Sequence, residues 1–114
     1  MTIQHKQLQS GGWNKLSLVV QLANIGSEVE RAIRWKNKNN QEYSNLAFYR
    51  ALELIDFTVS DQKNINRLKE VLRMREALID FFAGENIYSS SDEKWKKYFY
   101  SYNFASRVNN DNLK

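Results

Sequence analysis

Residues 16–33 read LSLVVQLANIGSEVERAI, and the spacing of their apolar side chains decides what kind of fold this chain can form. Its larger aliphatic residues recur at intervals of three and four, at Leu18, Leu22, Ile25, Val29 and Ile33. At 3.6 residues per turn, this spacing places them on one face of an amphipathic helix. The sequence therefore predicts a helix from about Trp13 to Lys38, with this stripe facing a core.

A second apolar stripe lies on the first half of the same predicted helix and consists of Leu16, Val19, Val20 and Ala23. A helix that is apolar over more than one face is expected to be buried on more than one side. This helix therefore lies either at the centre of the fold or against a second subunit. We take the stripe as the predicted dimer contact and expect a homodimer.

Three further helices are predicted, over residues 41–58, 62–83 and 90–108. Their boundaries rest on cap signals: a capping box of Asn39 and Glu42, an N-cap at Asp61, a C′ glycine at Gly84, and a capping box of Ser90 and Glu93. The chain has no proline and only four glycines, which favours long uninterrupted helices. Short connections between helices favour antiparallel neighbours.

We therefore expect an all-α fold, a four-helix up-down bundle, in a single domain spanning residues 1–114. Residues 1–12 and 109–114 are expected to be flexible tails. The length of 114 residues and the hydrophobic content of 42% suit one domain with a core of its own.

Arg75 is the residue that this pattern leaves unexplained. On the predicted third helix it falls within an apolar stripe that includes Val71, Leu72, Leu78 and Ile79. Because guanidinium stays charged in proteins, a buried arginine needs a carboxylate, a carbonyl or an anionic ligand. Glu28 is the first candidate partner, since it belongs to a polar row on the first helix, formed by Gln21, Asn24, Glu28, Arg31 and Trp35.

Three interpretations of Arg75 remain open. It belongs to an internal Arg–Glu–Asn network that fixes helix register, or it reaches water along its aliphatic stem. Alternatively, it lines a pocket between helices that holds a phosphate or carboxylate. The predicted ligand-binding residues in that case are Arg75, Arg50, Glu28, Asn24 and Arg31.

Several chemistries are excluded or disfavoured. Without cysteine there is no disulfide framework, Cys-based zinc site or thiol catalysis, which fits a cytoplasmic protein. The only histidine is His5, so a carboxylate–histidine metal site and a Ser–His–Asp triad both lack their histidine. There is no glycine-rich phosphate loop. We expect no metal, no cofactor and no enzymatic activity.

Membrane and nucleic-acid partners are also disfavoured. The polar start MTIQHKQLQS predicts no signal peptide, and no apolar run approaches the roughly 18 residues of a membrane span. The predicted fourth helix combines an aromatic stripe with Lys94, Lys96, Lys97 and Arg107, which is compatible with nucleic acid. An aromatic stripe at helical spacing is more typical of a core, and the net charge of +4 is mild.

In size and helical plan, the chain resembles small prokaryotic helical-bundle proteins such as the HEPN domains of toxin–antitoxin and nucleotidyltransferase pairs. HEPN ribonucleases carry an arginine followed four to six residues later by a histidine on a late helix. Neither Arg75 nor Arg107 is followed by histidine, so the resemblance implies a HEPN-like plan without that ribonuclease site. The expected function is a non-enzymatic binding or interaction module, and the alternative is an anion- or nucleotide-binding bundle.

Overall fold

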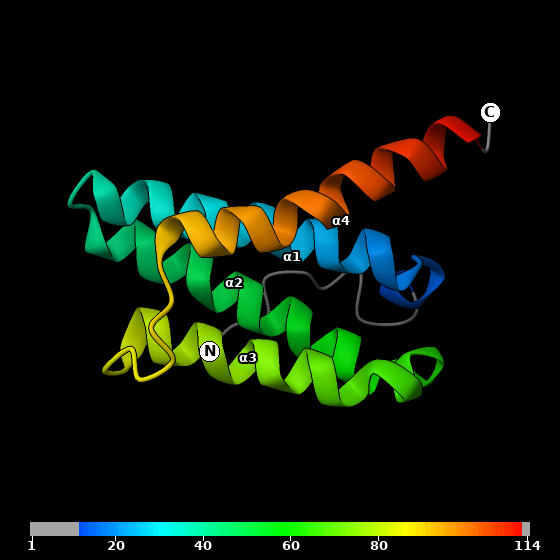
Figure 1. Cartoon of the computed structure of the whole chain (residues 1–114), viewed down its shortest axis with the longest axis horizontal. Coiled ribbons are helices and arrows are strands. Elements are labelled where there is room, and N and C mark those ends of the chain that lie inside the picture. Colours follow the sequence, from blue (N-terminus) through cyan, green and yellow to red (C-terminus); the bar gives the residue numbers. More distant parts are fainter. Residues whose placement is uncertain (1–11, 113–114) are drawn as a thin grey trace.

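Four α-helices run alternately up and down the molecule (Figure 1). The computed structural model describes residues 12–112, with side chains described as far as residue 107. The helices are α1 (Leu18–Asn37), α2 (Gln41–Ser60), α3 (Leu68–Ala83) and α4 (Asp92–Asn112), with short 3-10 helices η2 (Trp13–Lys15) and η3 (Gln62–Arg67). No strand occurs within residues 12–112, so the all-α prediction is confirmed. Most of the two predicted tails lies outside the described residues, and the backbone of residues 109–112 continues α4.

The helix α1 is the central element of the bundle. Both α2 and α4 pack along it, whereas α3 packs mainly against α2. In Figure 1, α4 lies along α1 and α3 lies along α2, so that α3 and α4 are apart along most of their length. Contact with two helices accounts for the burial of α1 over more than one face.

The approach of α1 to α4 depends on Gly26. A Cβ atom built on Gly26 would lie only 2.7 Å from Cβ of Phe99, which is itself 1% exposed. Such a distance is too short for any side chain, so glycine is the residue that lets the two helices meet here. Phe99 in turn stacks against Trp95 at 5.9 Å between ring centroids.

Small side chains bring α1 and α2 together in the same way. Ala32 on α1 and Ala47 and Ala51 on α2 are fully buried. Ser44, also buried, donates a hydrogen bond from Oγ to the Ala32 carbonyl oxygen at 2.8 Å. The bond satisfies the one polar atom of this contact, as a buried hydroxyl requires.

A buried polar network ties the start of α1 to the end of α2. Trp13 donates from Nε1 to Thr58 Oγ1 at 3.0 Å, and Gln21 donates from Nε2 to the Trp13 carbonyl and to Asp61 Oδ2. Asn64 donates from Nδ2 to Gln21 Oε1 at 2.9 Å. Each of these side chains is buried, and each has a partner, so the network fixes this end of the bundle at little cost in desolvation.

The structure corrects the predicted start of the first helix. The stretch from Trp13 to Lys15 forms η2, the chain is extended at Leu16, and α1 begins only after Ser17. The Ser17 hydroxyl caps α1 by accepting from the Val20 amide. The break lets Trp13 turn back into the core, where it is 2% exposed.

Other boundaries shift by a few residues. The cap of α2 is Asn40, whose Oδ1 accepts from the Tyr43 amide, and not Asn39, which adopts a positive φ of 60°. The predicted third helix begins as η3 after the predicted N-cap Asp61, and only from Leu68 is it α-helical. The hydroxyl that caps α4 belongs to Ser91, one residue after the predicted Ser90. None of the described helices combines the length and apolar character needed to cross a bilayer.

Replacing Gly26 with alanine is expected to lower the free energy of unfolding by about 1–3 kcal/mol, the usual cost of overpacking a core. Phe99 Cβ is attached to the α4 backbone, so α4 must shift to admit the new methyl group. The measurement is urea denaturation, with Ser27→Ala at the neighbouring exposed position as control. An alanine in a helix is normally more stable than glycine by roughly 1 kcal/mol, so equal or increased stability of Gly26→Ala would contradict the close contact.

Candidate functional site

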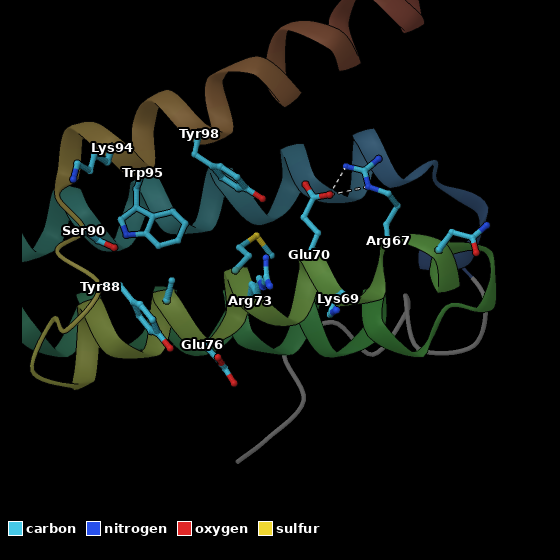
Figure 2. A pocket seen from close by; sticks show the side chains of 13 residues that line it. Arg67, Lys69, Glu70, Arg73, Glu76, Tyr88, Ser90, Lys94, Trp95 and Tyr98 are labelled. Carbon is cyan, nitrogen blue, oxygen red and sulfur yellow. Dashed lines mark hydrogen bonds and ion pairs between the residues drawn. The ribbon is translucent and has the colours of Figure 1, made fainter.

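A groove of about 830 Å³ separates α3 from α4. Its walls come from the end of η3, one face of α3, the loop before α4, and the first two turns of α4. Figure 2 shows side chains from α3 and α4 reaching into the same space from opposite sides. The groove exists because α4 packs on α1 and α3 on α2, so neither covers the other.

The inner wall of the groove is apolar and aromatic. Met74 on α3 and Trp95 on α4 are both buried, at 4% and 7% exposure, and Tyr98 is partly buried between α3 and α4. Trp95 and Tyr98 meet edge to face with 5.7 Å between ring centroids. Tyr88, from the loop before α4, adds a more exposed ring at 60%. These rings form a rigid surface on which an apolar group can pack.

Trp95 also holds a hydrogen-bond donor that stays unused within the described chain. Its Nε1 is buried and has no hydrogen-bond partner among the described residues. In Figure 2 the indole projects from α4 into the groove, with its nitrogen on the side that faces Ser90. A buried donor without an acceptor costs roughly 1–3 kcal/mol, and native structures rarely leave one unexplained. Because this nitrogen is buried, an acceptor from outside the protein reaches it only when a neighbouring side chain moves.

The rim of the groove is charged and mainly basic. Four cationic residues and two acidic residues line it: Arg67, Lys69, Arg73, Lys94, Glu70 and Glu76. Arg67 is the one of these four cations that forms an ion pair with a carboxylate of the described chain, at 2.8 Å from Glu70. Lys94 donates to the Ser89 carbonyl oxygen at 3.0 Å. The positive charges of Lys69, Arg73 and Lys94 are therefore not neutralised locally.

One end of the groove is closed by a bridge between α3 and α4. Tyr102 donates from its hydroxyl to Glu70 Oε1 at 3.1 Å, while Arg67 Nε donates to Oε2 of the same carboxylate at 2.8 Å. The Arg67 hydrogen bond, assisted by the one from Tyr102, holds the pKa of Glu70 below its ordinary value. Burial raises the pKa of the neighbouring Tyr98 phenol well above its ordinary value, so this ring stays neutral.

Arg75 does not meet the predicted partner Glu28. Its Nε donates to Asp56 Oδ1 at 2.9 Å, and the two side chains are 34% and 58% exposed. The reason is that α3 packs mainly against α2, so the edge of its apolar stripe reaches the surface where Asp56 lies. The internal Arg–Glu–Asn network does not form, and the position of Arg75 agrees with a stem that extends toward water, where the guanidinium pairs with a surface carboxylate.

The other predicted ligand residues divide between separate places. Glu28 accepts from Arg31 at 3.2 Å, and Asn24 is exposed and bonds to the Val20 carbonyl of its own helix. Arg31 and Arg50 do come together, in a small hollow between α1 and α2. Arg75 is not among the residues that line this hollow, so the predicted five-residue site does not form as one unit.

Sequence reasoning missed the groove and placed its aromatic residues in the core. For Trp95 and Phe99 that placement is confirmed, because both are buried. The sequence signal that could have indicated a surface site is that α4 has more aromatic residues than its buried face holds, including the exposed Tyr100 and Phe104. No cluster of three or more potential metal-ligating side chains occurs among the described residues.

No known protein family, no characterised protein and no solved structure matches this chain. The resemblance to HEPN domains is therefore not supported by these comparisons, and no argument about this chain rests on it. The groove and its chemistry remain the most direct evidence about function.

Replacing Arg67 with glutamine is expected to raise the pKa of Glu70 toward the ordinary value of about 4.3, because the charged hydrogen bond is lost. A lowered carboxyl pKa stabilises the folded state above the unfolded pKa, and this contribution disappears as the pH falls through the folded pKa. The Glu70 bridge is thus expected to hold at neutral pH and to loosen only once the pH falls below the ordinary carboxyl pKa.

The measurement is an NMR titration of the Glu70 carboxyl carbon. Arg34→Gln, an equivalent change at an exposed position of α1, is the control and should leave the titration unchanged. If Glu70 titrates at the same pH with and without Arg67, the bridge is not formed in solution.

Proposed function

We propose that this chain is a non-enzymatic binding module whose α3–α4 groove receives an acidic amphipathic helix from a partner protein. The observation that carries the proposal is the apolar floor of that groove, which is bordered by three cations, Lys69, Arg73 and Lys94, that form no ion pair within the described chain. The groove is formed by two helices that do not cover each other, and a third helix lying between them would complete the packing.

The dimensions of the groove suit a helix. The part of α3 that lines the groove runs from Lys69 to Ala77, which at 1.5 Å per residue corresponds to about 13 Å. That length accommodates about two turns of a partner helix. In helix-in-groove recognition, apolar anchors at positions i, i+3, i+4 and i+7 pack into the hydrophobic floor. Met74, Ala77, Trp95 and Tyr98 supply that floor here.

The residue types of the groove support a protein partner. Aromatic residues, methionine and arginine are enriched in protein interfaces, and tryptophan, tyrosine and arginine dominate their energetic centres. All of these types line the groove. The cations Lys69, Arg73 and Lys94 form no ion pair with a carboxylate of residues 12–107, and acidic side chains of the partner would complement them.

A single-stranded nucleic acid fits the groove less well. Stacking requires accessible ring faces, but Trp95 is only 7% exposed. Glu70 and Glu76 also line the groove, and their carboxylates would repel a phosphate backbone. A partner helix carries its acidic side chains at separate positions, so they can lie beside Lys69, Arg73 and Lys94, whereas a phosphate backbone carries a charge at every nucleotide.

The proposal is tested by selecting binders from a display library of 18-residue helical peptides. Selected peptides are expected to carry apolar residues at helical spacing together with Asp or Glu. Ala77→Arg, which fills the groove, should weaken their binding at least tenfold, or about 1.4 kcal/mol. Ala83→Arg makes the same change on an exposed position of α3 outside the groove and should have no such effect. Equal binding by the two variants, or no selectable peptide, would refute the proposal.

We also propose that a second copy of the chain contacts the N-terminal half of α1. Val19 and Val20 are partly exposed and do not belong to the core cluster, whereas Leu16 packs against the core and Ala23 is buried at 7% exposure. The contact would therefore rest on the two valines more than on the full predicted stripe.

Val20→Glu is expected to shift the oligomer toward monomer, because association would bury an unpaired charge. Analytical ultracentrifugation over a range of concentrations measures the shift. Ser27→Glu, which adds the same charge at an exposed position of α1, serves as the control. A sedimentation profile that is identical for Val20→Glu and the wild-type chain would exclude this contact.

A further inference from the structure

A second hollow, of about 190 Å³, lies between α1 and α2. It is lined by Arg31 and Trp35 from α1 and by Tyr43, Leu46 and Arg50 from α2. None of these residues lines the α3–α4 groove. The hollow therefore has its own walls and its own chemistry.

Two guanidinium groups converge on this small space. Arg31 donates from Nη1 to both oxygens of Glu28, at 3.2 and 3.4 Å, which leaves most of its five donors unused. Arg50 is partly buried and forms no ion pair with any carboxylate of the described chain. Two like charges beside one hollow repel each other, and an anion between them would replace this repulsion by attraction.

The aromatic wall gives the hollow its shape and adds a third cation. Trp35 and Tyr43 meet edge to face, with centroids 4.9 Å apart. Lys38 Nζ lies 5.3 Å from the centroid of the Trp35 ring. Arg31 and Arg50 are the charged residues that line the hollow, and Glu28, which pairs with Arg31, is not one of the lining residues.

Size and charge together define the ligand. The hollow is smaller than the roughly 300 Å³ that begins the range of drug-sized ligand pockets, so it suits a single small group. Arginine forks bind phosphate through paired, charge-assisted hydrogen bonds. A phosphate carries close to two negative charges at neutral pH and offers three acceptor oxygens, which matches two guanidinium groups.

We propose that the Arg31–Arg50 hollow is a phosphate-binding site. The phosphate comes either from inorganic phosphate or from a phosphorylated side chain, since both present the same dianionic group. This site is independent of the α3–α4 groove.

The test is an NMR titration of the ¹⁵N-labelled full-length chain with inorganic phosphate at constant ionic strength, followed at the Trp35 indole N–H and the arginine Nε–H signals. A parallel titration uses a short peptide containing phosphoserine. Saturable shifts of the Trp35 and Arg50 signals are expected with inorganic phosphate, with the phosphoserine peptide, or with both. Tighter binding of the peptide would assign the phosphorylated side chain as the ligand, and equal or weaker binding would assign inorganic phosphate.

Arg50→Gln and Arg31→Gln should each weaken binding at least tenfold, and Arg50→Lys should restore only part of it because lysine lacks the fork. Arg34→Gln removes the same charge from an exposed position of α1 outside the hollow and should change the dissociation constant less than twofold. Circular dichroism checks that each variant is folded. If one of Arg50→Gln and Arg31→Gln does not fold, the other still tests the proposal.

Two results would overturn the proposal. One is that chloride at matched ionic strength produces the same shifts as phosphate. The other is that Arg34→Gln weakens binding as much as Arg50→Gln, which would indicate diffuse attraction to a basic surface.

Discussion

The contact between Gly26 and Phe99 is the constraint on which the arrangement of this bundle depends. It lets α4 lie directly on α1, because no Cβ stands between the two helices. With α4 held on α1, and α3 held on α2, the two outer helices cannot close over each other. The groove is therefore a consequence of core packing elsewhere, because the contacts that set its two helical walls lie outside it.

The two ends of the bundle differ in how their buried polar atoms are satisfied. Around Gln21, Asp61 and Asn64, every side chain finds a partner within the protein, and the network is closed. Trp95 Nε1 has none, although it is as deeply buried. The chain thus has the means to satisfy a buried donor but leaves this one open.

The helices were predictable from sequence because their signal is local. Leu18, Leu22, Ile25, Val29 and Ile33 repeat at helical spacing, and four of these five are buried as expected. The break at Leu16 was not predictable in this way, since it depends on Trp13 reaching Thr58 on α2. Arg75 shows a similar limit. A helical wheel places it on an apolar stripe, but only the packing of α3 on α2 decides that this edge meets Asp56 and not Glu28. Sequence periodicity could not predict the groove either. Trp95 and Tyr98 occupy the same positions on a helical wheel whether or not another helix covers them.

The two proposed sites draw on the same rigid pair of helices. The α1–α2 contact, built on Ala32, Ala47 and Ala51, holds Arg31 and Arg50 at a fixed separation across the small hollow. The same pair supports α4 on one side and α3 on the other, and so sets the width of the groove. A ligand in the hollow would stiffen the α1–α2 pair without touching the groove. Binding at one site could affect the other only by shifting α1 relative to α2. Because the α1–α2 interface is closely packed, we expect the two sites to bind their ligands independently.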